Sequence, residues 1–133
     1  MILLDTSFLI DLLRERKNAI NKAVELVNRD KLSTTYVNIY ELLIGIYSKE
    51  GVDNEKRLET VENLTEKLEI LTLEKHSTIK SAKIGGELML KGRIVGDTDN
   101  MIAGIALSNG INTIVTRDKE HFERIKGIKV ESY

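Results

Sequence analysis

The sequence predicts an α/β domain of three layers, α/β/α, in which helices cover both faces of a mainly parallel central sheet. First, short apolar and β-branched runs alternate with longer segments of helical periodicity along the chain, a pattern typical of right-handed βαβ crossovers. Second, no internal repeat or low-complexity linker interrupts this alternation. Third, 133 residues that are 41% hydrophobic suffice for one core but not for two domains. We therefore expect a single domain over residues 1–133.

The first half of the chain is expected to hold two strands, each followed at once by helical periodicity. The segments, in order, are a strand over Met1–Leu4, a helix that closes at Arg14–Lys17, an amphipathic helix over 18–30, a strand over Leu32–Val37 and a helix over Asn38–Ser48. Gly51 marks a turn, and Asp53 or Asn54 then caps a strongly charged helix. Its apolar residues form one narrow stripe, so we expect this helix to stand out from the core. The stripe consists of Leu58, Val61, Leu64 and Leu68.

The second half repeats the alternation of strands and helices. The expected segments are a weak strand over Glu69–Leu73, a helix over 75–91 with Gly92 as its C-cap, a loop over Arg93–Thr98, a helix over about 99–109, a strand over Ile111–Thr116, a turn or short helix over 117–124 and a strand near Ile128–Val130. Ligands of parallel α/β sheets bind at the carboxyl ends of the strands, where the strand order reverses. Residues that follow the strands are therefore the candidates for a site.

The composition excludes several classes of protein. The chain has no cysteine, which rules out a disulfide scaffold, a thiolate metal site and a cysteine nucleophile, and fits a reducing, cytoplasmic location. Its apolar stretches are far shorter than the roughly 20 residues that a membrane-spanning helix needs, so we expect no membrane association. The net charge of −1 argues against a protein that coats nucleic acid through bulk electrostatics, and any polyanion must be gripped locally.

Acidic side chains are expected to gather at one edge of the sheet. Asp5 directly follows the first strand, and Asp118 lies two residues past a later one. Asp97 and Asp99 lie at the start of the helix between these strands, and Glu41 lies on the narrow polar stripe of a helix that follows the second strand. These carboxylates are far apart in sequence, yet the topology lets them converge on one crevice.

The chemistry of such an acidic cluster favours a divalent metal ion. Carboxylates within a few ångströms repel one another, so either their pKa values rise or a cation neutralises them. The candidate ligands are hard oxygen atoms without a supporting His or Cys, a set that selects Mg²⁺ or Mn²⁺ over Zn²⁺. Such an ion polarises a phosphoryl oxygen and lowers the pKa of bound water. The cluster therefore favours hydrolysis of phosphodiester bonds.

Four ordered motifs cover essentially the whole chain: LLDTSFLIDLL, YELLIG, GDTDNMIAGIALSNG and IVTRDKEHF. In their order and rough spacing they resemble the PIN-domain family, and most closely its VapC branch, the ribonuclease toxins of prokaryotic toxin–antitoxin pairs. This resemblance implies a PIN fold and an endoribonuclease that depends on Mg²⁺ or Mn²⁺. It also implies a homodimer and inhibition by a cognate VapB-like antitoxin.

The resemblance further implies roles for individual residues. Its acidic positions fall on Asp5, Glu41, Asp99 and Asp118, with Asp97 as an extra acid, and its hydroxyl positions on Thr6, Ser7 and Thr116. We expect Asp5 and Asp99 to be the innermost metal ligands, with Asp118 and Asp97 binding directly or through water. Glu41 then orients or deprotonates the attacking water, and if only one metal binds, Glu41 and Asp118 hold water and hydroxyl groups instead. Attack in line leaves 5′-phosphate and 3′-hydroxyl ends, as in the family.

The same acids also have simpler structural explanations. Asp97 and Asp99 suit helix N-caps or partners of a helix dipole. Glu41 can face solvent along its polar stripe, and Asp118 can be an ordinary turn residue. Asp5 is the hardest to explain in this way, because an acid directly after a buried strand destabilises the fold unless it is paired or solvated.

Other polar residues are expected to lie outside the acidic cluster. Asp11 is predicted to be a surface residue, and Asp53 a helix cap. His76 and His121 are predicted to be surface or packing residues, because neither lies beside a convincing serine nucleophile or strand-end acid. Phosphate contacts are sought among the cations near the cleft. These are Arg14, Lys17, Lys91, Arg93, Arg117 and Lys119, of which Arg93 and Arg117 are favoured.

Two other functions compete with an endoribonuclease. A Mg²⁺-dependent phosphatase also places an aspartate after a parallel strand, but an aspartyl nucleophile of the haloacid-dehalogenase type needs D-x-D, and this chain has Asp5-Thr6-Ser7. The second competing function is a non-catalytic PIN-like scaffold that binds RNA or protein. A site that has lost its activity should lack at least one carboxylate, and this chain retains them all. The favoured reading is a nuclease that cleaves single-stranded or loop RNA.

Overall fold

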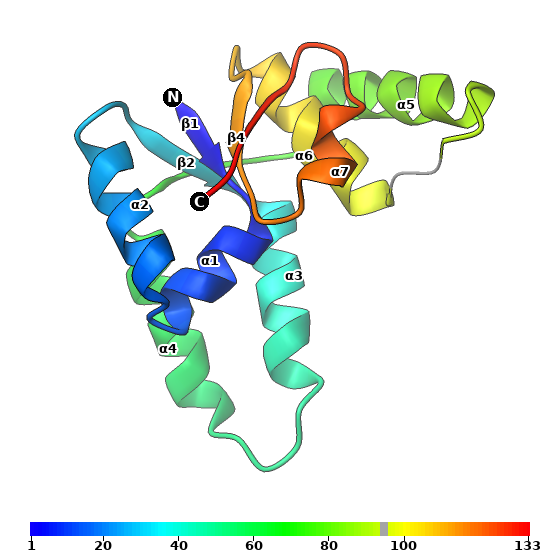
Figure 1. Ribbon diagram of the computed structural model, residues 1–133. Coiled ribbons are helices and arrows are strands. Elements are labelled where there is room, and N and C mark those ends of the chain that lie inside the picture. Colours follow the sequence, from blue (N-terminus) through cyan, green and yellow to red (C-terminus); the bar gives the residue numbers. More distant parts are fainter. Residues whose placement is uncertain (94–95) are drawn as a thin grey trace.

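The computed structural model describes residues 1–93 and 96–133, and its centre is a five-stranded sheet in the order β3-β2-β1-β4-β5 (Figure 1). The strands are β1 (Ile2–Leu4), β2 (Leu32–Thr35), β3 (Glu69–Leu71), β4 (Thr113–Val115) and β5 (Lys129–Glu131). Each neighbouring pair is parallel. The chain builds β2 and β3 on one side of β1 and then places β4 and β5 on the other, so the strand order reverses between β1 and β4.

Helices cover both faces of this sheet. They are α1 (Thr6–Leu13), α2 (Lys17–Val27), α3 (Tyr36–Tyr47), α4 (Asn54–Thr65), α5 (Lys75–Leu90), α6 (Asp97–Ser108) and α7 (Lys119–Glu123). Successive residues of β1 enter different cores, because side chains alternate across a strand. Leu3 packs with residues of α5, α6 and α7, whereas Ile2 and Leu4 pack with residues of α1 to α4. The predicted α/β/α fold class with a parallel sheet is therefore confirmed.

The expected strands and helices are present, but α3 begins earlier than the sequence suggests. The strand expected to run to Val37 ends at Thr35, because a capping box starts the helix there. The Thr35 hydroxyl accepts a hydrogen bond from the Asn38 N–H at 3.1 Å, and the Asn38 amide oxygen accepts one from the Thr35 N–H at 3.2 Å. These reciprocal bonds satisfy two free donors and outweigh the strand propensity of the β-branched run.

Helices α3 and α4 extend together away from the sheet (Figure 1), as expected for the charged helix. Val61 of α4 is only 2% exposed and packs in the same core as Leu42 and Ile46 of α3. Asp53 caps α4 by accepting a hydrogen bond from the Lys56 N–H at 3.1 Å, which confirms its predicted role. Within the described residues, no helix combines the length and the apolar character needed to cross a bilayer. That residues 1–133 form one domain stays a prediction.

Candidate active site

A small cleft of about 220 Å³ opens where β1 and β4 end, at the point where the strand order reverses. The residues that line it are Asp5, Thr6, Ser7, Ile10, Glu41, Thr98, Asp99, Arg117, Asp118 and His121. Four of the acids expected at this edge of the sheet therefore share one cleft. They come from four separate segments: the end of β1, helix α3, the first turn of α6 and the loop between β4 and α7.

Asp5 is buried at the end of β1, with 6% of its surface exposed. Its backbone N–H extends the sheet by donating to the Val115 carbonyl at 3.0 Å. Its carboxylate accepts hydrogen bonds from Thr116 Oγ1 (2.7 Å), Ser7 Oγ (3.3 Å) and Asn38 Nδ2 (3.2 Å). These donors are neutral, and burial outweighs them, so the pKa of Asp5 is raised above its ordinary value. The carboxylate is thus oriented, but its charge is not neutralised.

Two threonine hydroxyls fix Glu41 in the cleft. Thr6 Oγ1 donates to Glu41 Oε1 at 2.7 Å, and Thr98 Oγ1 donates to Oε2 at 3.2 Å. The Thr6 hydroxyl also accepts a hydrogen bond from Asn38 Nδ2 at 3.0 Å. The Glu41 side chain therefore joins α1, α3 and α6, which is not the arrangement of a residue that merely faces solvent.

Asp99 lies in the first turn of α6, and its side chain is 16% exposed. Burial raises the pKa of Asp99 to about 6, and the negative charge of Asp5 is the next contribution. Glu41 and Asp118 act in the same direction, while His121, whose Nδ1 lies 3.0 Å from Asp99 Oδ2, acts against it. Burial is thus the main cause of the raised pKa, and repulsion from the neighbouring carboxylates, which no cation neutralises, adds to it.

Arg117 and Asp118 lie in the loop that follows β4, and both are exposed. Two buried hydroxyl groups fix their backbone, because Arg117 N–H donates to Ser7 Oγ at 3.0 Å and Asp118 N–H donates to Thr116 Oγ1 at 3.1 Å. The Arg117 guanidinium pairs with Asp11, with Nη1 2.9 Å from Oδ1. Asp118 is the residue before α7 but makes no side-chain cap hydrogen bond.

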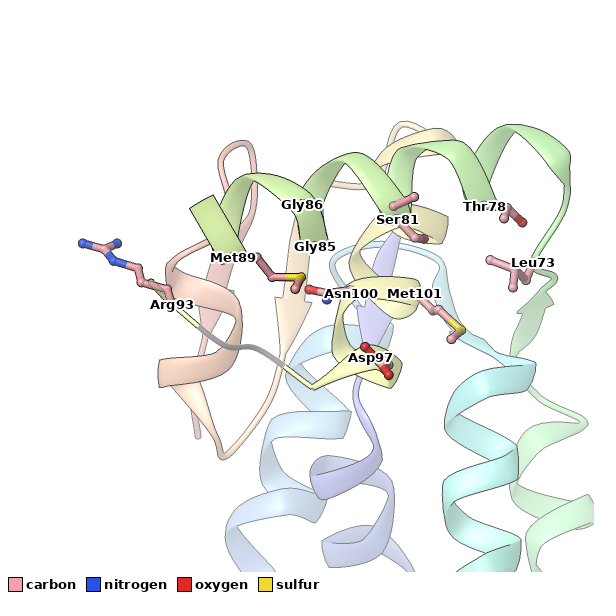
Figure 2. Close-up of a pocket in the computed structure, with 11 residues that line it drawn as sticks. Leu73, Thr78, Ser81, Gly85, Gly86, Met89, Arg93, Asp97, Asn100 and Met101 are labelled. Atoms are coloured by element: carbon pink, nitrogen blue, oxygen red, sulfur yellow. The ribbon is translucent and has the colours of Figure 1, made fainter. Parts of the chain in front are cut away.

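Two of the predicted site residues lie away from this cleft. Asp97 and Arg93 line a larger hollow of about 570 Å³ between α5 and α6. Figure 2 shows Asp97 at the start of α6, while the Arg93 side chain extends outward past the end of α5. The structure does not place these two residues with the four acids, and their site roles stay predictions.

Three residues in or near the cleft were not predicted from the sequence to belong to the site. Thr98 lies between two acids in the sequence and supports Glu41. His121, predicted to be a surface or packing residue, is exposed but lines the cleft beside Asp99. The prediction that Asp11 is a surface residue is wrong, because Asp11 is only 5% exposed. Helical spacing was the available signal, since Asp11 lies four residues after Ser7 on the same face of α1.

The donor atoms of the cleft suit a hard divalent cation in their chemistry. They are carboxylate and hydroxyl oxygens, with His121 as the nitrogen donor. Among residues 1–93 and 96–133, no three His, Asp or Glu side chains are close enough together to form a ready-made metal site. The charges of Asp5, Glu41 and Asp118 nevertheless add to the effect of burial on the pKa of Asp99, and a cation would offset this negative charge. Binding of Mg²⁺ or Mn²⁺ would have to draw the carboxylates closer together.

Comparison with known proteins identifies relatives along almost the whole chain. The model of the PIN domain family matches residues 2–128. A tRNA(fMet)-specific endonuclease VapC from Salmonella typhimurium is 32% identical over 131 residues, which cover 98% of this chain and 96% of that protein. Ribonuclease VapC1 from Haemophilus influenzae is 27% identical over 133 residues, with 98% and 96% of the two chains covered.

Solved structures of similar chains give the same result. A chain of the DNA-bound VapBC from Salmonella typhimurium superposes with a TM-score of 0.85 at 32% identity, covering 99% of this chain and 98% of that one. A chain of VapBC2 from Rickettsia felis, with a TM-score of 0.88 at 23% identity and coverage of 100% and 99%, shows the same fold. The chain therefore belongs to the PIN domain family and, within it, to the VapC ribonuclease toxins of toxin–antitoxin systems.

Proposed function

We propose that this VapC-type endoribonuclease hydrolyses RNA phosphodiester bonds in the cleft formed by Asp5, Glu41, Asp99 and Asp118, with bound Mg²⁺ or Mn²⁺. The observation that carries this proposal is the convergence of these acids on one cleft, together with the pKa of Asp99 near 6. A fold gains no stability from like charges that line one partly desolvated cleft. Such an arrangement is typical of a functional site.

In this proposal the four acids divide the work of holding the metal and the water. Asp5 and Asp99 would hold the ion, and Asp118 would bind it directly or through water, while Asp97, which lines the other hollow, stays a predicted extra ligand. The bound ion would lower the pKa of water and stabilise the charge on the departing oxygen. Glu41 orients or deprotonates the attacking water, because two threonine hydroxyls fix both of its oxygens.

Two buried hydroxyl groups next to Asp5 have a positioning role. Ser7 and Thr116 share a hydrogen bond of 3.0 Å, and the hydroxyls of both lie within hydrogen-bond distance of the Asp5 carboxylate. They keep this carboxylate in one orientation without removing its charge. Attack in line on the phosphate then leaves 5′-phosphate and 3′-hydroxyl ends, with Arg117 as a phosphate contact at the rim and Arg93 as a second candidate.

The RNA substrate and the partner are proposed from the relatives. Single-stranded or loop RNA suits a cleft that must reach an exposed phosphate. One relative is a tRNA(fMet)-specific endonuclease, which makes tRNA the first substrate to test. Similar solved chains come from VapBC complexes, so we propose a VapB-like antitoxin that inhibits this cleft.

We also propose a homodimer formed through the outer face of α5. Met89, which lines the hollow shown in Figure 2, is 74% exposed, and Ile79 and Leu90 of the same helix are 47% and 90% exposed. Large apolar side chains that a helix leaves exposed are candidates for such an interface. Sedimentation of a Met89→Lys variant should show a monomer, whereas Val24→Lys, at a 59% exposed position of α2, should sediment like the wild type. Equal behaviour of both variants would exclude this interface.

The decisive experiment is cleavage of a structured RNA pool that includes tRNA, in Mg²⁺, in Mn²⁺ and in EDTA. We expect metal-dependent cutting that EDTA and Asp5→Asn abolish. The matched control is Asp30→Asn, which removes an exposed carboxylate paired with the Met1 amino group, and it should cut normally. If folded wild type and Asp5→Asn protein behave alike in Mn²⁺, the catalytic proposal fails, and an RNA-binding scaffold is the function to test.

A further inference from the structure

A second buried carboxylate, Asp11, lies beside the cleft and has no part in the mechanism above. Among the described residues, Asp5 and Asp11 are the two acids that are buried, at 6% and 5% exposure. Arg117 Nη1 donates to Asp11 Oδ1 at 2.9 Å and to Oδ2 at 3.2 Å. The Tyr133 hydroxyl donates to the same Oδ2 at 2.5 Å. Asp11 therefore joins α1, the loop after β4 and the segment after β5.

The Arg117 guanidinium is only partly used by this pair. Both contacts with Asp11 involve Nη1, and within the described part of the chain Nη2 and Nε have no hydrogen-bond partner. An arginine carries five N–H donors in a fixed fork, and this side chain is 51% exposed while it lines the cleft. The geometry leaves donors free at the rim of the site, where a phosphate group would arrive.

Tyr133 holds Asp11 from the other side. Its ring packs edge-on against buried Phe8, with 4.7 Å between the ring centroids. Burial and the hydrogen bond to Asp11 raise the pKa of the Tyr133 phenol, so it remains a donor at neutral pH. The ring fixes the hydroxyl, and the hydroxyl in turn fixes the Asp11 carboxylate.

The position of Arg117 needs such a restraint. A mobile guanidinium beside Asp5, Asp99 and Asp118 would pair with one of these carboxylates, because charge-assisted pairs are strong in a partly desolvated site. In that pair the guanidinium could not contact a phosphate, and it would neutralise a carboxylate whose charge attracts a metal ion. Asp11 prevents this by engaging Arg117 outside the acidic cluster.

We propose that Asp11 and Tyr133 are positioning residues, which hold Arg117 at the rim of the cleft so that its free N–H groups contact a phosphate of the bound RNA strand. The inference rests on the proposed function only in taking RNA as the ligand of this cleft. It assigns to Asp11 the orientation of a cation rather than the binding of a metal. The Tyr133 hydroxyl supports that orientation.

The test is binding of a fluorescein-labelled single-stranded RNA, measured by anisotropy in EDTA over a series of KCl concentrations. Arg117→Gln should weaken binding about tenfold and flatten the slope of log affinity against log salt by about 0.7, the value for one phosphate contact on a single strand. Asp11→Asn should do the same in the wild-type background and add nothing in the Arg117→Gln background. Tyr133→Phe, which keeps the ring, should shift both quantities in the same direction by less.

The matched control is Arg29→Gln, because Arg29 also pairs with a carboxylate, Glu131 at 2.6 Å, but lies in the turn after α2, outside the cleft. It should leave the affinity and the slope unchanged. A tenfold effect of Asp11→Asn that persists in the Arg117→Gln background, or an unchanged slope in both single variants, would overturn the inference. Thermal unfolding identifies any variant that fails to fold, and Tyr133→Phe with Arg117→Lys then carries the comparison.

Cleavage assays separate this inference from the proposed function. In Mn²⁺, Asp11→Asn should raise KM by about the same factor as it weakens binding and change kcat much less. If the wild type binds RNA with the expected slopes but does not cut it, the catalytic proposal fails and the positioning role stands. If the wild type cuts RNA but the salt slopes do not change, the positioning role fails and the catalytic proposal stands.

Discussion

The two ends of α1 each present a buried acid, and their surroundings are opposite. Asp5, before the helix, accepts hydrogen bonds from hydroxyl and amide groups alone, and its pKa is raised. Asp11, near the end of the helix, is paired with a guanidinium and a phenol. Burial alone therefore does not identify a metal ligand. A buried carboxylate with neutral partners keeps its charge available for a cation, whereas one that already holds a cation organises its neighbours instead.

Removal of the Asp5 charge is expected to give the largest effect. Asp5→Asn should lower kcat on the order of 10³-fold, because it removes a metal ligand and the charge stabilisation that the ion supplies. The same substitution should raise the free energy of unfolding of the metal-free protein by about 1 kcal/mol, since it removes a buried charge that has no cationic partner. RNA cleavage and urea unfolding in EDTA measure the two quantities. If Asp5→Asn lowers the free energy of unfolding as well as kcat, Asp5 stabilises the fold as Asp11 does, and the proposed difference between the two acids is wrong.

Removal of the Asp11 charge should affect stability in the opposite direction. Asp11→Asn is expected to lower the free energy of unfolding by about 2 kcal/mol, less than for a fully buried pair because Arg117 is half-exposed. Urea unfolding at pH 7 checks this value. The control is Asp30→Asn, which breaks an exposed ion pair and should leave the free energy of unfolding almost unchanged. If Asp11→Asn changes the free energy of unfolding as little as the control does, the ion pair with Arg117 does not stabilise the folded protein.

The raised pKa of Asp99 predicts how stability depends on pH. Its pKa is about 6 in the folded protein against 3.8 for an ordinary aspartate, so the folded state binds a proton more tightly. The free energy of unfolding of the wild type minus that of Asp99→Asn should therefore fall as the pH rises from about 4 to 6, by about 1 kcal/mol after solvent screening. Urea unfolding in EDTA at several pH values tests this. Added Mn²⁺ should remove this fall. A difference between the wild type and Asp99→Asn that rises with pH would contradict the prediction.

The sequence was sufficient for the fold because the determining signals are local. Alternation of Ile2, Leu3 and Leu4 between two cores follows directly from the period of a strand. The boundary of α3 was missed because reciprocal hydrogen bonds between Thr35 and Asn38 outweigh the strand propensity of the same residues. Such capping geometry becomes visible only when the backbone is known.

The site was predictable to the extent that it depends on strand ends. Asp5 and Asp118 follow strands, and the topology brings them into one cleft with Asp99. Asp97 lies two residues before Asp99, and residues two apart on a helix point in different directions, which explains why it lines another hollow. The role of Asp11 was invisible, because its partner Tyr133 lies 122 residues away in the sequence.

The smallest expected effect concerns the neutral donors that distinguish the Asp5 end of α1. Thr6→Val removes the hydroxyl that donates to Glu41 Oε1 at 2.7 Å but leaves the bond from Thr98 to Oε2. We expect kcat to fall about fivefold, the equivalent of about 1 kcal/mol, with KM little changed because Glu41 acts on water rather than on RNA. Thr60→Val, at an exposed site of α4 where the hydroxyl bonds its own helix, should leave kcat unchanged. If kcat falls equally in both variants, the loss comes from a general effect of replacing a helical threonine. The hydrogen bond from Thr6 would then have no role in orienting Glu41.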